Sequence, residues 1–177
     1  MSDFHVFEDS ELSLIVSLPV RVGAWMARQD DDVRSARDEQ REVRALTAVI
    51  EELSKINKSP FAAELAQRAL GGRSLWGGWM EMPEDRLFSD VTRACHMVDE
   101  RMPQGTGKAF RSALWRVARA VAMAYGESEA ENASENMFST LVRHLVGKLE
   151  SATPDDPTHV SPSEAQALKK LKAALQS

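Results

Sequence analysis

An acidic segment in the C-terminal half of the chain carries the densest group of side chains that could do chemistry. Residues 127–135, ESEAENASE, contain no basic residue and four glutamates, Glu127, Glu129, Glu131 and Glu135. A helix would place Glu131 and Glu135, which stand four apart, on one face. Carboxylate oxygens that converge in this way are the ligands that Ca²⁺ and Mg²⁺ take in proteins. The segment is therefore a candidate site for a divalent cation.

The same glutamates also have a structural interpretation. Ser128-x-x-Glu131 forms a capping box, and carboxylates near a helix N-terminus are stabilised by the helix dipole. The sequence contains no Asp-rich calcium-binding loop of twelve residues. Cation binding and helix capping therefore stay open as alternatives.

An earlier turn has a similar composition. Asp30, Asp31 and Asp32 follow an apolar stretch, and Glu39 and Glu42 come soon after them. This turn offers the same kind of oxygen ligand as the later one. It differs in its counter-charge, which five arginines supply: Arg28, Arg34, Arg37, Arg41 and Arg44.

Two tryptophans, Trp76 and Trp79, lie in residues 71–83, GGRSLWGGWMEMP, where the glycines predict a loop. Tryptophans exposed on such a loop would form a hot spot for a protein partner. In the alternative arrangement, both rings fold back and close one end of the helical bundle.

The pair Cys95-His96 suggests a metal ligand or a nucleophile. Cys95, however, falls on the apolar face of its expected helix, and the other histidines are scattered: His5, His144 and His159. A zinc site needs several cysteine or histidine ligands, so this set is insufficient. We therefore expect Cys95 to fill the core rather than to react.

The elements that would position these residues are helices. Apolar residues recur at helical spacing along most of the chain, and the alternation typical of strands is nearly absent. The pattern predicts an all-α fold, a single-domain bundle of about seven helices. Proline, glycine and capping signals place these helices at about residues 9–27, 35–57, 60–71, 83–102, 108–125, 128–149 and 164–177.

The chain is expected to form one bundle with a C-terminal extension. Residues 1–150 make up the predicted bundle domain, and residues 151–163 form a linker rich in proline, aspartate and serine. Residues 164–177 then form an amphipathic helix, which either docks on the bundle or remains a tail.

A weak internal repeat relates two parts of the chain. Aligning residues 20–32 with residues 117–129 matches Met26-Ala27 to Met123-Ala124, and Asp30 to Glu127. In each part an apolar helix leads through an acidic turn into a second helix. The repeat predicts two pseudo-symmetric helical hairpins, and the alternative is a chance likeness between amphipathic helices.

The repeat and its acidic turns resemble the tellurite-resistance TerB-like helical family. The likeness is carried by residues 121–135, VAMAYGESEAENASE, and by residues 17–32, SLPVRVGAWMARQDDD, as the matching N-terminal half. The resemblance implies a compact helical bundle, a non-enzymatic role in stress response and an acidic site for a divalent cation. By position, it implies the cation ligands Asp30, Asp32, Glu127, Glu129 and Glu135.

The composition argues against several classes of protein. A formal net charge of −5 disfavours binding to nucleic acid or to an anionic membrane surface. The longest mostly apolar stretch, residues 12–27, contains Arg21 and is too short and too polar to span a bilayer. One cysteine allows no internal disulfide, and no secretory signal is visible, so we expect a cytoplasmic protein.

Sequence motifs of the common enzyme classes are missing. The fragments GGR and GTGK lack the P-loop spacing, and neither Gly-x-Ser-x-Gly, His-Glu-x-x-His nor Glu-x-x-His occurs.

We therefore expect a non-enzymatic binding or adaptor module with a protein partner and Ca²⁺ or Mg²⁺ as the candidate cofactor. The first alternative is a metal-free interaction or structural module, a homo-oligomer formed through Trp76 and Trp79 or a bundle face. The second is an enzyme whose site is assembled from distant residues around His96 or His144.

Overall fold

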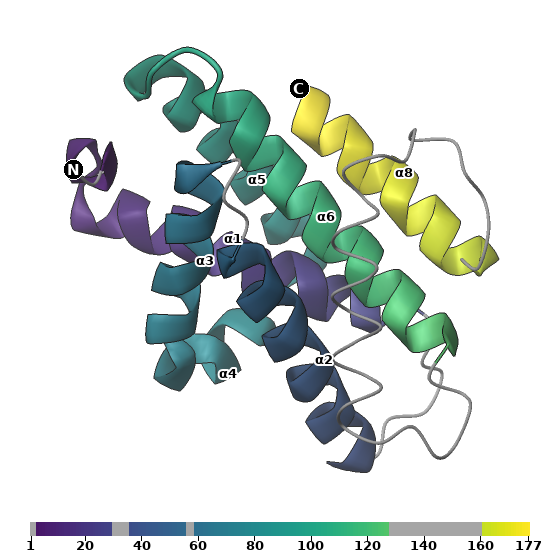
Figure 1. The fold of residues 1–177 in the computed structure, drawn as a ribbon. Coiled ribbons are helices and arrows are strands. Elements are labelled where there is room, and N and C mark those ends of the chain that lie inside the picture. The colour runs from purple at the N-terminus through teal and green to yellow at the C-terminus, as the bar shows by residue number, and fades with distance from the viewer. Residues whose placement is uncertain (1–2, 30–35, 56–58, 128–160) are drawn as a thin grey trace.

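The computed structural model describes residues 3–29, 36–55, 59–127 and 161–177 (Figure 1). Those residues contain seven α-helices and no strand, which confirms the predicted all-α bundle. The helices are α1 Asp9–Ala27, α2 Ala36–Ser54, α3 Pro60–Gly71, α4 Trp76–Met80, α5 Glu84–Arg101, α6 Thr106–Glu127 and α8 Pro162–Gln176, with short 3-10 helices η1 Asp3–Val6 and η2 Arg73–Leu75. The helix expected at 128–149 lies outside the described residues.

Two helices begin at the capping signals that the sequence carries. At α3, Ser59 accepts a hydrogen bond from the Ala62 amide and Pro60 is the first helical residue. At α8, the Ser161 hydroxyl accepts from the Glu164 amide, while the Glu164 carboxylate accepts from the Ser161 amide. These contacts satisfy backbone N–H groups that have no partner inside the helix.

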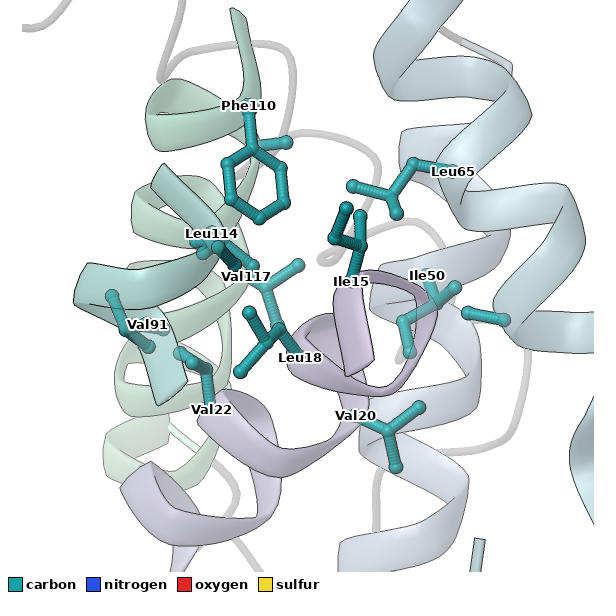
Figure 2. Packing of buried hydrophobic residues seen from close by; sticks show 14 of the residues in the cluster. Ile15, Leu18, Val20, Val22, Ile50, Leu65, Val91, Phe110, Leu114 and Val117 are labelled. Atoms are coloured by element: carbon teal, nitrogen blue, oxygen red, sulfur yellow. The ribbon is translucent and has the colours of Figure 1, made fainter. Parts of the chain in front are cut away.

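Helix α1 is the central element of the described bundle. It contacts α2, α3, α4, α5 and α6, and every residue from Ile15 to Ala27 is buried. Figure 2 shows Ile15 and Leu18 between Leu65 and Ile50 on one side and the α6 residue Phe110 on the other. A helix that is apolar on most sides is stable only when neighbours cover all of them.

The close contact between α1 and its neighbours depends on Gly23. A Cβ atom added at this position would overlap Cδ1 of Leu46 on α2 and would lie 3.2 Å from Cγ1 of Val117 on α6. The absence of a side chain therefore lets three helices meet at one point. Because α1 and α6 contact each other, the first helices of the predicted repeat are neighbours. Residues 30–32 of its first acidic turn and residues 128–131 of its second lie outside the described residues.

The C-terminal helix α8 is docked on the bundle. It contacts α5 and α6 and runs antiparallel to α6 (Figure 1). Leu171 is fully buried, and the Arg111 Nε atom donates to the Leu175 carbonyl at 2.7 Å. The Thr92 hydroxyl donates to the Ala174 carbonyl at 3.2 Å. Helix α8 is therefore docked on the bundle, as in the first of the two predicted alternatives, and is not a free tail.

The prediction of a loop over residues 71–83 was wrong for most of its length. The chain forms η2 and α4 there, and Gly77 and Gly78 lie inside α4. Glycine weakens a helix but does not forbid one when tertiary contacts favour it. Here the contacts come from Trp76 and Trp79, which are both buried.

Candidate functional site

The predicted cation ligands are not among the side chains that the structure describes. Asp30, Asp32, Glu129, Glu131 and Glu135 lie outside the described residues, and Glu127 is described only as the last residue of α6. Elsewhere, within residues 3–29, 36–55, 59–127 and 161–177, no group of three or more histidine, cysteine, aspartate or glutamate residues could hold a metal ion. The cation site therefore stays a prediction from the sequence.

Trp76 and Trp79 pack into the bundle, with 2% and 8% of their surfaces exposed. The Trp76 indole N–H donates to the Ala69 carbonyl at 2.9 Å, and the Arg73 guanidinium lies 5.7 Å from the centre of the Trp76 rings. Both rings therefore lie inside the bundle, as in the predicted arrangement in which they fold back onto it. Trp79 also contributes to the wall of a cavity.

Cys95 is part of the core, as predicted, and burial raises the pKa of its thiol to about 11. A thiol with this pKa is almost entirely protonated at neutral pH, and the thiolate is the reactive form. His96, the next residue, is exposed. The two side chains therefore form no nucleophile–base pair of the kind that cysteine enzymes use.

The structure instead contains a cavity that the sequence interpretation missed. We call it the Arg21 cavity; it has a volume of about 350 Å³ and lies where the C-terminal end of α1 meets α4 and α5. This volume is typical of small-molecule pockets. Its wall consists of Arg21, Trp25, Arg28, Gln29, Trp79, Met80, Met82, Glu84 and Leu87.

Arg21 is the unusual residue of this wall, because its charged side chain is 98% buried. Its Nη1 atom lies 2.8 Å from Oδ2 of Asp90 on α5, and the Nε atom of Arg86 lies 3.7 Å from the same oxygen. The Nε and Nη2 atoms of Arg21 are buried as well, and neither has a hydrogen-bond acceptor in the described part of the chain. Nη1 is thus paired with Asp90, while Nε and Nη2 are enclosed and have no acceptor among the described residues.

The neighbouring residues of α1 complete the polar part of the wall. The Trp25 indole N–H is buried and has no acceptor among the described residues, while the ring packs edge-on against Phe88 at 5.1 Å. Arg28 donates from Nη1 to the Met80 carbonyl at 2.6 Å and so ties α1 to α4. The Gln29 amide donates to the Trp25 carbonyl at 2.9 Å.

The electrostatics of the wall favour a negative ligand. Two guanidinium groups line it, and its one lining carboxylate, Glu84, is exposed and lies 3.4 Å from the Lys170 ammonium. The Trp25 indole adds a hydrogen-bond donor to the wall, and the Gln29 amide carries both a donor and an acceptor. Among the described residues that line the cavity there is no histidine or cysteine. This arrangement can bind and orient an anion.

A second hollow, of about 1010 Å³, lies between α5 and α8. It is an open groove, and residues such as Phe88, Ala173 and Ala174 give it a mostly apolar wall. None of the described buried donors that lack an acceptor lines this groove. The Arg21 cavity is therefore the better candidate for a ligand site.

One feature of the sequence could have indicated the cavity. Arg21 is the only charged residue between Leu12 and Ala27, a stretch that the sequence interpretation placed in a buried helix. A charge inside such a helix needs a partner or a function. The partner, Asp90, and the walls from α4 and α5 come from distant parts of the chain, so spacing along the sequence does not disclose them.

Comparison with known proteins adds no further constraint. No protein-family model matches the chain, and no curated protein or solved structure matches it either. The resemblance to the TerB-like family thus stays a prediction. Within the described residues, no helix has both the length and the apolar character needed to cross a membrane.

Proposed function

We propose that this chain is a non-enzymatic helical binding module whose ligand is a small anion held in the Arg21 cavity. The observation that carries the proposal is the buried edge of Arg21, where Nε and Nη2 lack an acceptor in the described residues. A buried N–H group without an acceptor destabilises a fold by about 1–3 kcal/mol, and more when it is charged. An anion in the cavity would remove that penalty.

Two further observations support binding without catalysis. The buried thiol of Cys95, with a pKa of about 11, is a poor nucleophile at neutral pH. The polar groups of the cavity wall that lack an acceptor are donors that hold an anion in place without exchanging a proton with it. The proposed role is therefore recognition, with occupancy of the cavity strengthening the junction of α1, α4 and α5.

The proposal is tested by thermal unfolding in the presence of anions. Acetate, phosphate and sulfate, compared with chloride at equal ionic strength, are titrated against the wild type and Arg21→Lys. The lysine keeps a positive charge near Asp90 but lacks the flat guanidinium edge. A ligand that binds only the folded state raises the melting temperature as its concentration rises.

We expect at least one of these anions to raise the melting temperature of the wild type and to lose most of this effect in Arg21→Lys. Arg44→Lys, an exposed change on α2 outside the cavity wall, is the matched control and should respond like the wild type. Equal shifts in all three proteins would indicate a general salt effect. That result, or no shift in any of them, would refute the proposed function.

A divalent cation at the acidic segment is a second proposal, and it is supported by the four glutamates of residues 127–135. Millimolar Ca²⁺, Mg²⁺ or Mn²⁺ should then raise the melting temperature, because the cation binds the native state. Replacing Glu131 and Glu135 together by glutamine should abolish the rise, whereas Glu64→Gln on α3 should not. Melting that is insensitive to all three cations would leave helix capping as the role of these glutamates.

A further inference from the structure

We infer that the ligand of the Arg21 cavity is a monocarboxylate with a compact apolar group, and that its carboxylate binds the Nε–Nη2 edge of Arg21. The inference rests on the proposed function and narrows it from an anion to one chemical class. It depends on three features of the cavity: the geometry of the donors, the charge around them and the apolar part of the wall.

The geometry of the donors matches a carboxylate. In a guanidinium group, the N–H bonds of Nε and Nη2 point the same way from one edge, spaced like the two oxygens of a carboxylate. Because Nη1 of Arg21 is held by Asp90 at 2.8 Å, the free edge is fixed in orientation before a ligand arrives. The indole N–H of Trp25 provides a third donor in the same wall.

The chain already uses two-point pairing of this kind elsewhere. Arg101 donates from Nη1 and Nη2 to the two carboxylate oxygens of Glu11, at 2.5 and 2.8 Å. Arg111 donates from the same two atoms to the two oxygens of Asp99, at 2.9 and 2.5 Å. Arg21, which lines the cavity, differs from both because its Nε and Nη2 atoms have no acceptor among the described residues.

The surrounding charge favours a single negative charge on the ligand. Arg21, Arg28 and the Glu84 carboxylate are the charged residues of the wall, so the wall carries one net positive charge, while Asp90 and Arg86 behind it offset each other. A monoanion neutralises that charge, whereas a phosphate dianion would leave a buried excess of negative charge, which is unfavourable. Glu84, also in the wall, would repel a second carboxylate on the same ligand.

The rest of the wall is suited to an apolar group. Met80, Met82 and Leu87 contribute aliphatic or thioether side chains, and the ring of Trp79 adds an aromatic surface. Methionine side chains adapt to ligands of different shape. The volume of about 350 Å³ leaves room for a short branched chain or a single ring.

The test is isothermal titration calorimetry of the full chain with acetate, butyrate, benzoate, succinate and phosphate. Butyrate should bind more tightly than acetate, by about fourfold for each CH₂ group that becomes buried. Benzoate should bind more tightly than acetate as well, and both succinate and phosphate should bind more weakly than butyrate. This order separates a carboxylate site with an apolar wall from a general anion site.

Two variants locate the binding. Trp25→Phe removes the indole N–H while keeping an aromatic ring, and it should weaken butyrate binding about tenfold or more, as expected for a hydrogen bond to a charged group. Arg21→Lys should abolish measurable binding. Trp115→Phe changes a tryptophan outside the cavity wall and should leave the affinity unchanged.

The possible outcomes distinguish this inference from the proposed function. Phosphate binding that exceeds butyrate binding and is lost in Arg21→Lys would overturn the monocarboxylate assignment and leave the anion site intact. Equal affinities for acetate, butyrate and benzoate would overturn the inference that the ligand carries an apolar group. Absence of binding by every anion would overturn both proposals, and unchanged butyrate binding in Trp25→Phe would contradict the placement of the carboxylate.

Discussion

At Gly23, one missing methyl group sets how closely α1 approaches α2 and α6. Alanine in a helix is more favourable than glycine by about 1 kcal/mol, but overpacking a core costs about 1–3 kcal/mol. The added Cβ would overlap Leu46, which is itself buried, so the second effect should prevail. We expect Gly23→Ala to lower the free energy of unfolding in urea by about 1 kcal/mol.

Gly77→Ala is the matched control for this substitution. Gly77 also lies in a helix, but it is exposed, and an added Cβ would meet no atom within 4 Å. Here only the helix propensity changes, so the free energy of unfolding should rise by up to about 1 kcal/mol. If Gly23→Ala proved as stabilising as Gly77→Ala, the tight contact between the three helices would be disproved.

The pair between Arg111 and Asp99 should make stability depend on pH in acid. The hydrogen bonds from Arg111 hold the pKa of Asp99 below its ordinary value of 3.8. A carboxyl whose pKa is lower in the folded state adds stability above the unfolded-state pKa, and this stability is lost as the pH falls through the folded-state pKa. Asp99→Asn should therefore flatten the fall in stability between about pH 4 and pH 2.

This prediction is checked by urea unfolding at several pH values. Glu100→Gln removes the adjacent carboxylate on α5 and serves as the control, with a pH profile close to that of the wild type. Glu11 should behave like Asp99, because hydrogen bonds from Arg101 lower the pKa of Glu11. If Asp99→Asn and the wild type lost stability in parallel below pH 4, the ion pair would not contribute to stability.

At the scale of the element, α8 is held by its capping box and by contacts to α5 and α6. Ser161→Ala removes an N-cap contact that contributes about 1 kcal/mol to helix stability. We expect amide hydrogen exchange within α8 to become about fivefold faster, because local opening becomes easier by that amount. Gln166→Ala, an exposed change in the same helix, is the control, and equal exchange in the two variants would show that the cap does not hold α8 in place.

The sequence predicts elements well where the signals are local. The caps at Ser59 and Ser161, and the apolar faces of the helices, are visible in short windows of sequence, and the structure confirms them. The glycine-rich segment shows the opposite case. Its glycines favour a loop locally, but burial of Trp76 and Trp79 against distant helices makes it helical, and that burial cannot be seen in the segment itself.

At the scale of the whole molecule, the candidate site follows from the central position of α1. A helix enclosed by five others buries whatever its sequence places in the middle, including Arg21. The sequence shows the charge but not its surroundings. The position of Asp90, the unoccupied edge of the guanidinium and the wall from α4 arise only when α1, α4 and α5 meet, so the cavity could not have been predicted.

The position of Trp25 and Trp79 in the cavity wall has a practical consequence. Two of the four tryptophans in the chain line the cavity that a ligand would enter, whereas Trp76, whose N–H donates to the Ala69 carbonyl, is not among its lining residues. Indole emission responds to the polarity and hydrogen bonding of its immediate surroundings. The protein therefore has a built-in optical reporter, and entry of a colourless molecule should change its ultraviolet fluorescence without an attached dye.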